Sequence, residues 1–174
     1  TTTGFSNAQT YHTLPGADIR IADANGDGKN DVVQLGKNGV IAFLRQAYGG
    51  LLADPVYYIP EGTVTGSNMT VCDVNRDRID DVIVAVETET GSAIMVFTGA
   101  DTFPSDPTIY DGMPDPGALA CGDINLDSRP DVVLTHHGSD YLGLFLEGTA
   151  GTLQPEDFVE VPVAERYGPR ARSE

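Results

Sequence analysis

The sequence predicts an all-β fold of β-propeller blades, each with four antiparallel strands, and three observations favour it. An Asp- and Asn-rich loop recurs with a period of fifty residues, and apolar segments flank every copy. Gly and Pro are frequent, and no long stretch has the periodicity of a helix. A period of this length with several strands per unit is typical of a propeller array. About three repeats fit the chain. We expect them to be part of a larger propeller, because propellers close with about four to eight blades.

The first copy of the loop, residues 23–31, reads Asp-Ala-Asn-Gly-Asp-Gly-Lys-Asn-Asp and is followed by an apolar pair. Side-chain oxygens stand at its first, third, fifth and ninth positions, and the seventh residue can offer its carbonyl. Hard oxygen ligands in a tight loop are what Ca²⁺ requires, since it takes six to eight oxygens at about 2.3–2.6 Å. The loop therefore predicts a calcium site.

The same oxygen-bearing residues return at the same positions in two further copies, which begin at Asp73 and Asp123. The alternative is three turns without metal, because Asp and Asn favour turns in any case. Agreement in register across all three copies favours about three calcium ions. The expected ligands, with the seventh residue of each set binding through its carbonyl alone, are Asp23, Asn25, Asp27, Lys29 and Asp31; Asp73, Asn75, Asp77, Ile79 and Asp81; and Asp123, Asn125, Asp127, Arg129 and Asp131.

Glycine at the fourth and sixth positions distinguishes the first loop from the other two. Gly26 and Gly28 allow a left-handed backbone, which costs a non-Gly residue about 1–2 kcal/mol. The first loop is therefore expected to bind calcium best. An EF-hand is excluded, because the twelfth position lacks Glu and the flanks are β-rich. The residues that replace the glycines are Arg76, Arg78, Leu126 and Ser128.

Four strands are expected in every repeat, taken in chain order. The blades are expected over residues 16–65, 66–115 and 116–165, with 1–15 as the outer strand of a preceding blade and 166–174 as the start of a further one. The expected strands are 18–22, 32–35, 40–44 and 56–59; 69–72, 82–86, 93–97 and 108–110; and 118–121, 132–135, 142–146 and 158–161.

The net charge of the 174-residue chain is −16, which argues against nucleic acid or an anionic membrane as a partner. Nine of the 26 acidic residues stand at the expected ligand positions, so three calcium ions would bring the charge to about −10. No apolar run is long enough to span a bilayer. The sequence begins without Met or a leader, as expected of a processed or excised segment.

Two cysteines and a pair of histidines each have competing interpretations. Cys72 stands one residue before the first Asp of its loop and Cys121 stands two before, so strand alternation points them to opposite faces. Two buried free thiols are therefore preferred over a disulfide. His136 and His137 suggest zinc, but no third ligand follows at a metal-binding spacing. Exposed turn residues are the preferred interpretation of this pair.

The Asp-x-Asn-x-Asp-Gly-x-x-Asp loop followed by an apolar strand resembles the FG-GAP/VCBS repeats of integrin-α-like β-propellers. The resemblance covers about three repeats, with only partial matches to the Phe-Gly and Gly-Ala-Pro motifs, at residues 16–18 and 117–118. It implies a calcium-stabilised binding or adhesion scaffold, secreted or on a cell surface. Its partner would be a protein or a glycan.

A non-enzymatic role is expected, because no nucleophile elbow, phosphate loop or dinucleotide loop is present. The alternatives are an accessory domain of a secreted polysaccharide-active enzyme and an architectural subunit of a surface assembly. The ligand is expected on the face opposite the calcium loops, because binding residues concentrate on loops of a rigid scaffold. Further blades, from the same polypeptide or from other copies, are expected against the two lateral faces.

Overall fold

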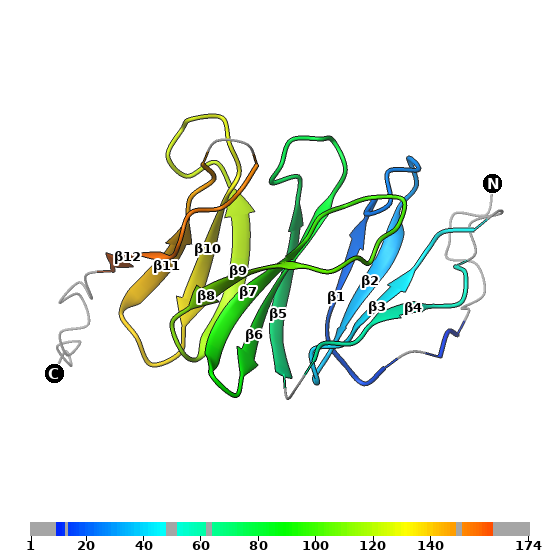
Figure 1. Cartoon of the computed structure of the whole chain (residues 1–174), viewed down its shortest axis with the longest axis horizontal. Coiled ribbons are helices and arrows are strands. Elements are labelled where there is room, and N and C mark those ends of the chain that lie inside the picture. Colours follow the sequence, from blue (N-terminus) through cyan, green and yellow to red (C-terminus); the bar gives the residue numbers. More distant parts are fainter. Residues whose placement is uncertain (1–9, 13, 48–51, 62–63, 149–150, 162–174) are drawn as a thin grey trace, which may run out of the picture.

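The computed structural model describes residues 10–12, 14–47, 52–61, 64–148 and 151–161. Within these residues the chain forms twelve strands and no helix, arranged as three antiparallel four-stranded sheets (Figure 1). Each sheet takes four consecutive strands and is one blade. The strands are β1 (Gly16–Ala22), β2 (Asp31–Gly36), β3 (Ile41–Leu44) and β4 (Val56–Tyr58); β5 (Val64–Cys72), β6 (Asp81–Thr88), β7 (Gly91–Phe97) and β8 (Thr108–Gly112); and β9 (Pro116–Gly122), β10 (Asp131–His136), β11 (Tyr141–Phe145) and β12 (Asp157–Glu160).

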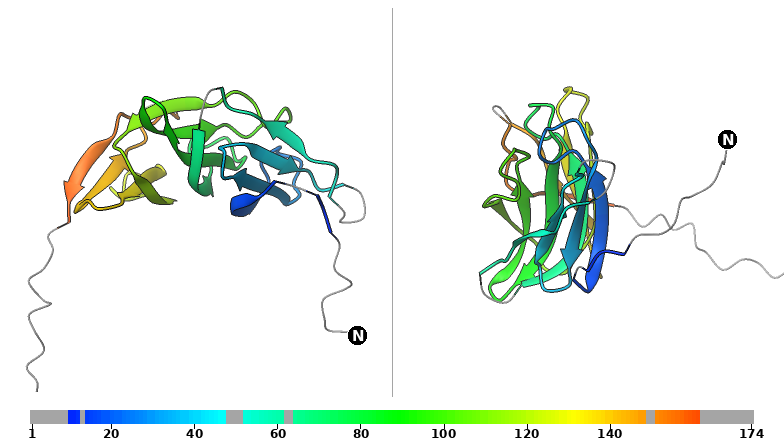
Figure 2. Two further views of the ribbon diagram at one scale, coloured as in Figure 1. Left: turned by 90° about the horizontal axis from the view of Figure 1, so that it is seen from below. Right: turned by 90° about the vertical axis from the view of Figure 1, so that its right-hand side faces the viewer.

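The three blades stand side by side in an arc, with their sheets facing one another (Figure 2). The predicted all-β blade architecture is therefore confirmed, and most strand boundaries agree within two residues. The exception is β5, which begins at Val64, five residues before its expected start. Its register shifts between Gly66 and Asn68, and such a bulge interrupts the two-residue alternation by which strands are recognised.

All three Asp-rich loops lie at the same edge of the array, because each joins the first strand of its blade to the second (Figure 1). Antiparallel pairing then places the connections between the third and fourth strands at this edge as well. The turns between the second and third strands and the links between blades lie at the opposite edge. The division of the surface that the sequence suggested follows from this topology.

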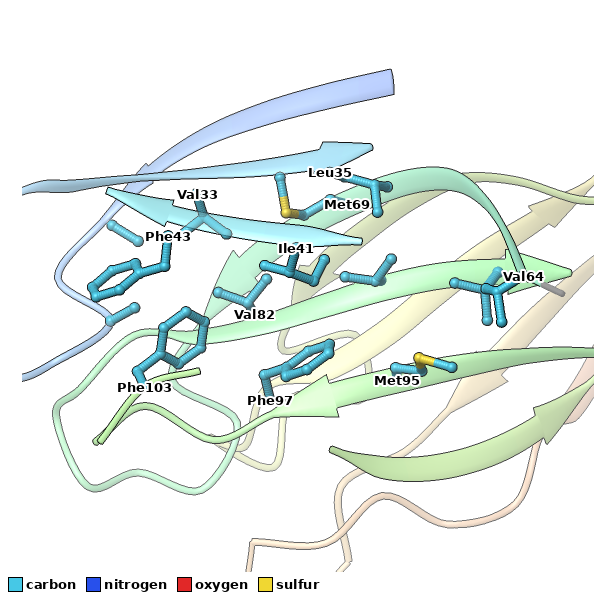
Figure 3. Packing of buried hydrophobic residues seen from close by; sticks show 14 of the residues in the cluster. Val33, Leu35, Ile41, Phe43, Val64, Met69, Val82, Met95, Phe97 and Phe103 are labelled. Atoms are coloured by element: carbon cyan, nitrogen blue, oxygen red, sulfur yellow. The ribbon is translucent and has the colours of Figure 1, made fainter. Parts of the chain in front are cut away.

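The first core lies between the first two blades, where apolar side chains of β2 and β3 meet those of β6 and β7. Figure 3 shows Phe43, Phe97 and Phe103 gathered there, with Phe43 and Phe103 ring centroids 4.8 Å apart in an edge-on contact. Full burial of each such side chain contributes about 1.5–3 kcal/mol. The blades are therefore held together mainly by apolar packing between their faces.

The second blade is buried on both of its faces. Residues 81–86 of β6 are all buried, and alternate side chains of this run belong to the cores on either side of the blade. Val82 packs toward the first blade and Ile83 toward the third, where Leu134 and Phe145 complete the second core. A continuous apolar strand is what burial on two faces requires.

A disulfide joins Cys72 of β5 to Cys121 of β9, with 6.4 Å between their Cα atoms. The prediction of two free thiols is therefore wrong. The alternation argument was correct, because the two side chains do point to opposite faces of their own sheets. When equivalent sheets stack in a row, however, opposite faces of consecutive blades are the ones that meet. The disulfide consequently ties the second blade to the third.

The predicted outer strand over residues 1–15 and the predicted start of a further blade over 166–174 fall largely outside the described residues. Of these segments the structure describes residues 10–12, 14 and 15, and none of them is in a strand. Tyr11 nevertheless contacts the first blade, since its hydroxyl accepts the Leu52 N–H at 3.1 Å. The described part of the chain holds no helix of the length and apolar character that a membrane crossing needs.

Candidate calcium-binding loops

The three Asp-rich loops share one backbone conformation, although only the first has glycine at its fourth and sixth positions. Gly26 and Gly28 have φ angles of 72° and 79°. The replacing residues keep these positive angles, and each bears a strain of about 1–2 kcal/mol. The angles are 62° for Arg76, 75° for Arg78, 63° for Leu126 and 67° for Ser128.

Side-chain oxygens of the first loop fold inward onto backbone amides. The Asp27 N–H donates to Asp23 Oδ1 at 3.0 Å and to Asn25 Oδ1 at 2.9 Å. The Gly28 N–H donates to Asp23 Oδ2 at 2.8 Å, and the Lys29 N–H donates to Asp27 Oδ1 at 3.0 Å. Because one N–H contacts both oxygens, the carboxylate of the first residue and the amide oxygen of the third lie on the same side of the loop.

The other two loops repeat this hydrogen-bond set position by position. In the second loop the Asp77 N–H donates to Asp73 Oδ1 and Asn75 Oδ1, both at 2.9 Å. The equivalent distances in the third loop, from the Asp127 N–H to Asp123 and Asn125, are 3.1 and 2.9 Å. The bonds from the sixth and seventh amides also recur. The sequence repeat is therefore also a repeat of geometry.

The Asp at the ninth position has a structural role that the sequence did not reveal. Asp31, Asp81 and Asp131 are fully buried, with relative exposures of 0%. One carboxylate oxygen of each accepts the backbone N–H of a residue just after the third strand of the blade. The other oxygen accepts a donor from the loop itself. The first set of donors is Gln46 at 2.7 Å, Gly99 at 2.8 Å and Glu147 at 2.9 Å.

Burial raises the pKa of two of these carboxyl groups. The pKa of Asp81 rises to about 6 because desolvation outweighs the backbone N–H groups that it accepts. The pKa of Asp31 is also raised, first by desolvation and then, after a lowering contribution from the Gln46 N–H, by the charges of Asp27 and Asp23. A neighbouring cation would favour the ionised form of both groups.

The seventh residues were expected to act through their carbonyls alone, and the structure gives their side chains roles of their own. Lys29 Nζ lies 2.9 Å from Asp27 Oδ2 at the surface. Arg129 makes a 2.6 Å contact with Asp127 and also reaches Glu147, with 2.9 Å between Nε and Oε2. The Glu147 side chain is completely buried, so Arg129 neutralises a carboxylate that water cannot reach.

Ile79, the third of these residues, joins the second loop to the first. Its Cδ1 lies 2.8 Å from where a Cβ on Gly26 would stand, so any other residue there would displace the end of the Ile79 side chain as well as adopt a strained backbone angle. Next to it, the Asp23 N–H donates to Asp80 Oδ2 at 2.9 Å, and the Asp80 N–H donates to the Asp23 carbonyl at 3.2 Å. Neighbouring loops are thus in direct contact.

Within the described residues, no three acidic, histidine or cysteine side chains are gathered in a metal-binding arrangement. The loop oxygens instead accept the N–H groups given above. The donor set of each loop consists of oxygens only, which is the chemistry of a Ca²⁺ site and not of a zinc site. The residues present therefore fit calcium by ligand type.

His136 is buried, with 4% of its surface exposed, so the expectation of an exposed turn residue is wrong for this histidine. β10 runs one residue further than expected, and His136 falls on the inward face of that strand. Its Nε2 lies 2.8 Å from Glu156 Oε1, and its Nδ1 lies 3.2 Å from the Pro114 carbonyl. His137 is exposed, as expected.

Repeated four-stranded blades with an Asp-rich loop at one edge define a β-propeller-like repeat module. The family profile described as FG-GAP-like repeat matches residues 23–84 and 73–134, so each match runs from the loop of one blade into the second strand of the next. Together the matches cover more than half of the chain, and the chain belongs to the FG-GAP-like repeat family. A comparison with curated proteins finds no match.

Proposed function

We propose that the chain is an extracellular, calcium-stabilised β-propeller module that binds a protein or glycan partner and has no catalytic role. The observation that carries the calcium part is the identity of the three loops. They share the same oxygens, the same two left-handed positions and the same inward hydrogen bonds, although four of the six left-handed residues are not glycine. Selection for one loop geometry explains this better than three unrelated turns.

In this proposal each ion is held by the carboxylates of the first and fifth residues, the amide oxygen of the third and the carbonyl of the seventh. The buried ninth carboxylate would complete the site while it anchors the loop to its blade. Burial and, to a smaller extent, the charges of Asp27 and Asp23 raise the pKa of Asp31, and a divalent cation would relieve this cost of the ionised form. Metal binding and loop stability are then coupled.

Two features favour an extracellular location. The disulfide between the second and third blades is typical of proteins from oxidising compartments. Loops with strained non-glycine positions suit the millimolar Ca²⁺ found outside cells, since weak sites of extracellular modules work at about 10⁻⁴–10⁻³ M.

Membership of the FG-GAP-like repeat family supports a binding role in preference to catalysis. The two alternative functions are an accessory domain of a secreted polysaccharide-active enzyme and an architectural subunit of a surface assembly. A glycan array probed with the purified chain separates glycan binding from a purely architectural role. Turnover of a polysaccharide by the isolated chain would contradict the non-catalytic proposal.

Calcium is tested by thermal unfolding with the disulfide intact, in EGTA and in millimolar CaCl₂. We expect Ca²⁺ to raise the Tm, because a ligand that binds only the folded state stabilises it by about 1.4 kcal/mol per site at ten times its Kd. Asp73→Asn should reduce this increase. Asp101→Asn, an exposed acid outside the loops, is the matched control. An unchanged Tm together with no heat of Ca²⁺ binding in calorimetry would sink the calcium proposal.

A further inference from the structure

A groove of about 430 Å³ opens where the end of β4 in the first blade meets the start of β8 in the second. We call it the β4–β8 groove. Its apolar lining includes Ile59 and Ile109, which are 72% and 56% exposed, and the buried Met95. Its polar lining is the half-buried Tyr58 with two exposed carboxylates, Glu61 and Asp106. The groove therefore joins an apolar surface to an acidic end.

The two carboxylates come from different blades, and in addition to burial the charges of both raise the pKa of the Tyr58 hydroxyl group. The Tyr58 ring is fixed against Phe97 of the second blade, with 4.9 Å between the ring centroids. Burial raises the pKa of Tyr58, and the charges of Asp106 and Glu61 raise it further. Among the residues that the structure describes, no ion pair involves either carboxylate. Among the described residues, negative charge thus gathers around Tyr58 without a compensating ion pair.

The equivalent place between the second and third blades shows what such a carboxylate does when it has a partner. Glu156, one residue before β12, turns inward there, pairs with His136 at 2.8 Å and accepts the Met113 N–H at 2.7 Å. Gly143 makes room for it, because a Cβ at that position would overlap the carboxylate. In the second blade the counterpart of Gly143 is Met95, whose side chain fills this space.

The carboxylates at the two interfaces between blades therefore differ in whether they have partners. Between the second and third blades an imidazole and a backbone N–H from the chain itself satisfy the carboxylate. Between the first and second blades Met95 takes the place of Gly143, and Glu61 and Asp106 are exposed where they line the groove. No described residue supplies the positive group that would complete the arrangement, which leaves the place open to a cation from a partner.

We propose that the β4–β8 groove binds a lysine or arginine side chain of a partner protein, with the alkyl stem on Ile59, Met95 and Ile109 and the cationic head beside Glu61 and Asp106. Long basic side chains lay their methylene groups on apolar surface while the charge stays at a polar edge, which matches this lining. The net charge of −16 further attracts a basic partner and speeds its encounter. The inference rests on the proposed binding role and specifies its partner.

The experiment is a ¹⁵N NMR titration of the whole chain in CaCl₂ with Nα-acetyl-lysine methylamide. Nα-acetyl-norleucine methylamide, which has the same alkyl chain without the ammonium group, is the comparison ligand. We expect the lysine compound to shift the amide signals of Ile59, Glu61 and Ile109, and the norleucine compound to bind more weakly. Binding should also weaken as salt is added, because the contact is between exposed charges.

The double variant Glu61→Gln/Asp106→Asn should weaken lysine binding about tenfold, since each exposed charge contact is worth up to about fivefold in affinity. Asp101→Asn, in the same connection between β7 and β8, should leave it unchanged. Equal binding of both compounds, shifts outside the groove, or full affinity in the double variant would overturn the proposal. If a partner binds elsewhere on the chain and the groove signals do not shift, this inference is wrong but the proposed binding role is retained.

Discussion

At the scale of single residues, Glu147 shows how a buried charge is handled between blades. Its side chain is fully buried, and Oε1 accepts the Gly151 N–H at 2.9 Å. Arg129 supplies the nearest positive charge, and Arg76 of the preceding blade lies 3.8 Å from Oε1. A buried carboxylate that loses its partner is costly, because its charge is then compensated neither by water nor by protein.

Arg129→Ala is therefore expected to lower the free energy of unfolding by about 1–3 kcal/mol, because the buried Glu147 carboxylate loses its nearest positive charge while the more distant Arg76 remains. Lys29→Ala, at the same position of the first loop, should cost much less, since its pair with Asp27 is exposed. Urea unfolding of both variants measures the difference. Equal and small losses would show that Arg129 contributes no more than a surface pair.

Gly143 is the second residue whose identity the tertiary contacts dictate. Gly143→Ala is expected to lower the free energy of unfolding by about 1–3 kcal/mol, because the added Cβ overlaps Glu156 and displaces it from His136. Gly122→Ala is the matched control, since a Cβ there meets nothing within 4 Å. Thermal unfolding of the two variants is the measurement. A neutral Gly143→Ala would mean that the pair relaxes without loss.

At the scale of the element, the three Asp-rich loops have similar positive φ angles at their fourth and sixth positions, although only the first loop has glycine there. Gly28 and Leu126 make this testable, because both have positive φ angles and neither is constrained by packing. A Cβ on Gly28 meets nothing within 4 Å, and Leu126 is 87% exposed. Any change in stability at these positions then reports the conformational preference of the backbone.

We expect Gly28→Ala to destabilise the protein by about 1 kcal/mol and Leu126→Gly to stabilise it by a similar amount, because only glycine adopts a left-handed conformation without strain. The comparison is made by chemical unfolding in CaCl₂, where the loops are held alike. A stabilising Gly28→Ala would contradict the backbone angles. The two variants oppose each other in sign, so a general effect of substitution in these loops cannot imitate the result.

At the scale of the whole molecule, the stacking of blades leaves one apolar face at each end of the array. On the first blade, Ile19 and Ile21 are 59% and 69% exposed. On the third blade, Val159 is 45% exposed, whereas its counterpart in the second blade, Tyr110, is packed against the second core. Monomers rarely expose such apolar surface without a partner.

Further blades, from the same polypeptide or from other copies, are therefore expected against these faces. The 18.4-kDa chain should associate in a concentration-dependent way when its mass is measured by light scattering. Ile21→Glu should weaken this association, because it places a charge on the lateral face, whereas Val56→Glu on the outer strand should not. A monodisperse monomer at all concentrations would contradict the expectation for other copies of the chain.

The repeat, the blade architecture and the loops that carry the oxygens could all be predicted from the sequence. These features are local, since a strand is recognised from alternating side chains and a loop from residues within nine positions of one another. The segments bounded by the loops and turns therefore became strands nearly where expected. The first part of β5 was not predicted, because the extra residue of its bulge breaks the alternation of side chains.

Which faces of the blades meet depends on the tertiary structure and cannot be derived from the strand pattern. Stacking in a row turns opposite faces of consecutive sheets toward each other, so Cys72 and Cys121 form a disulfide although they point in opposite directions within their own blades. The same stacking buries His136 beside Glu156 and forms the β4–β8 groove between two blades. These contacts join residues that are far apart in the chain, and side-chain alternation within a strand holds no information about the distance between two sheets.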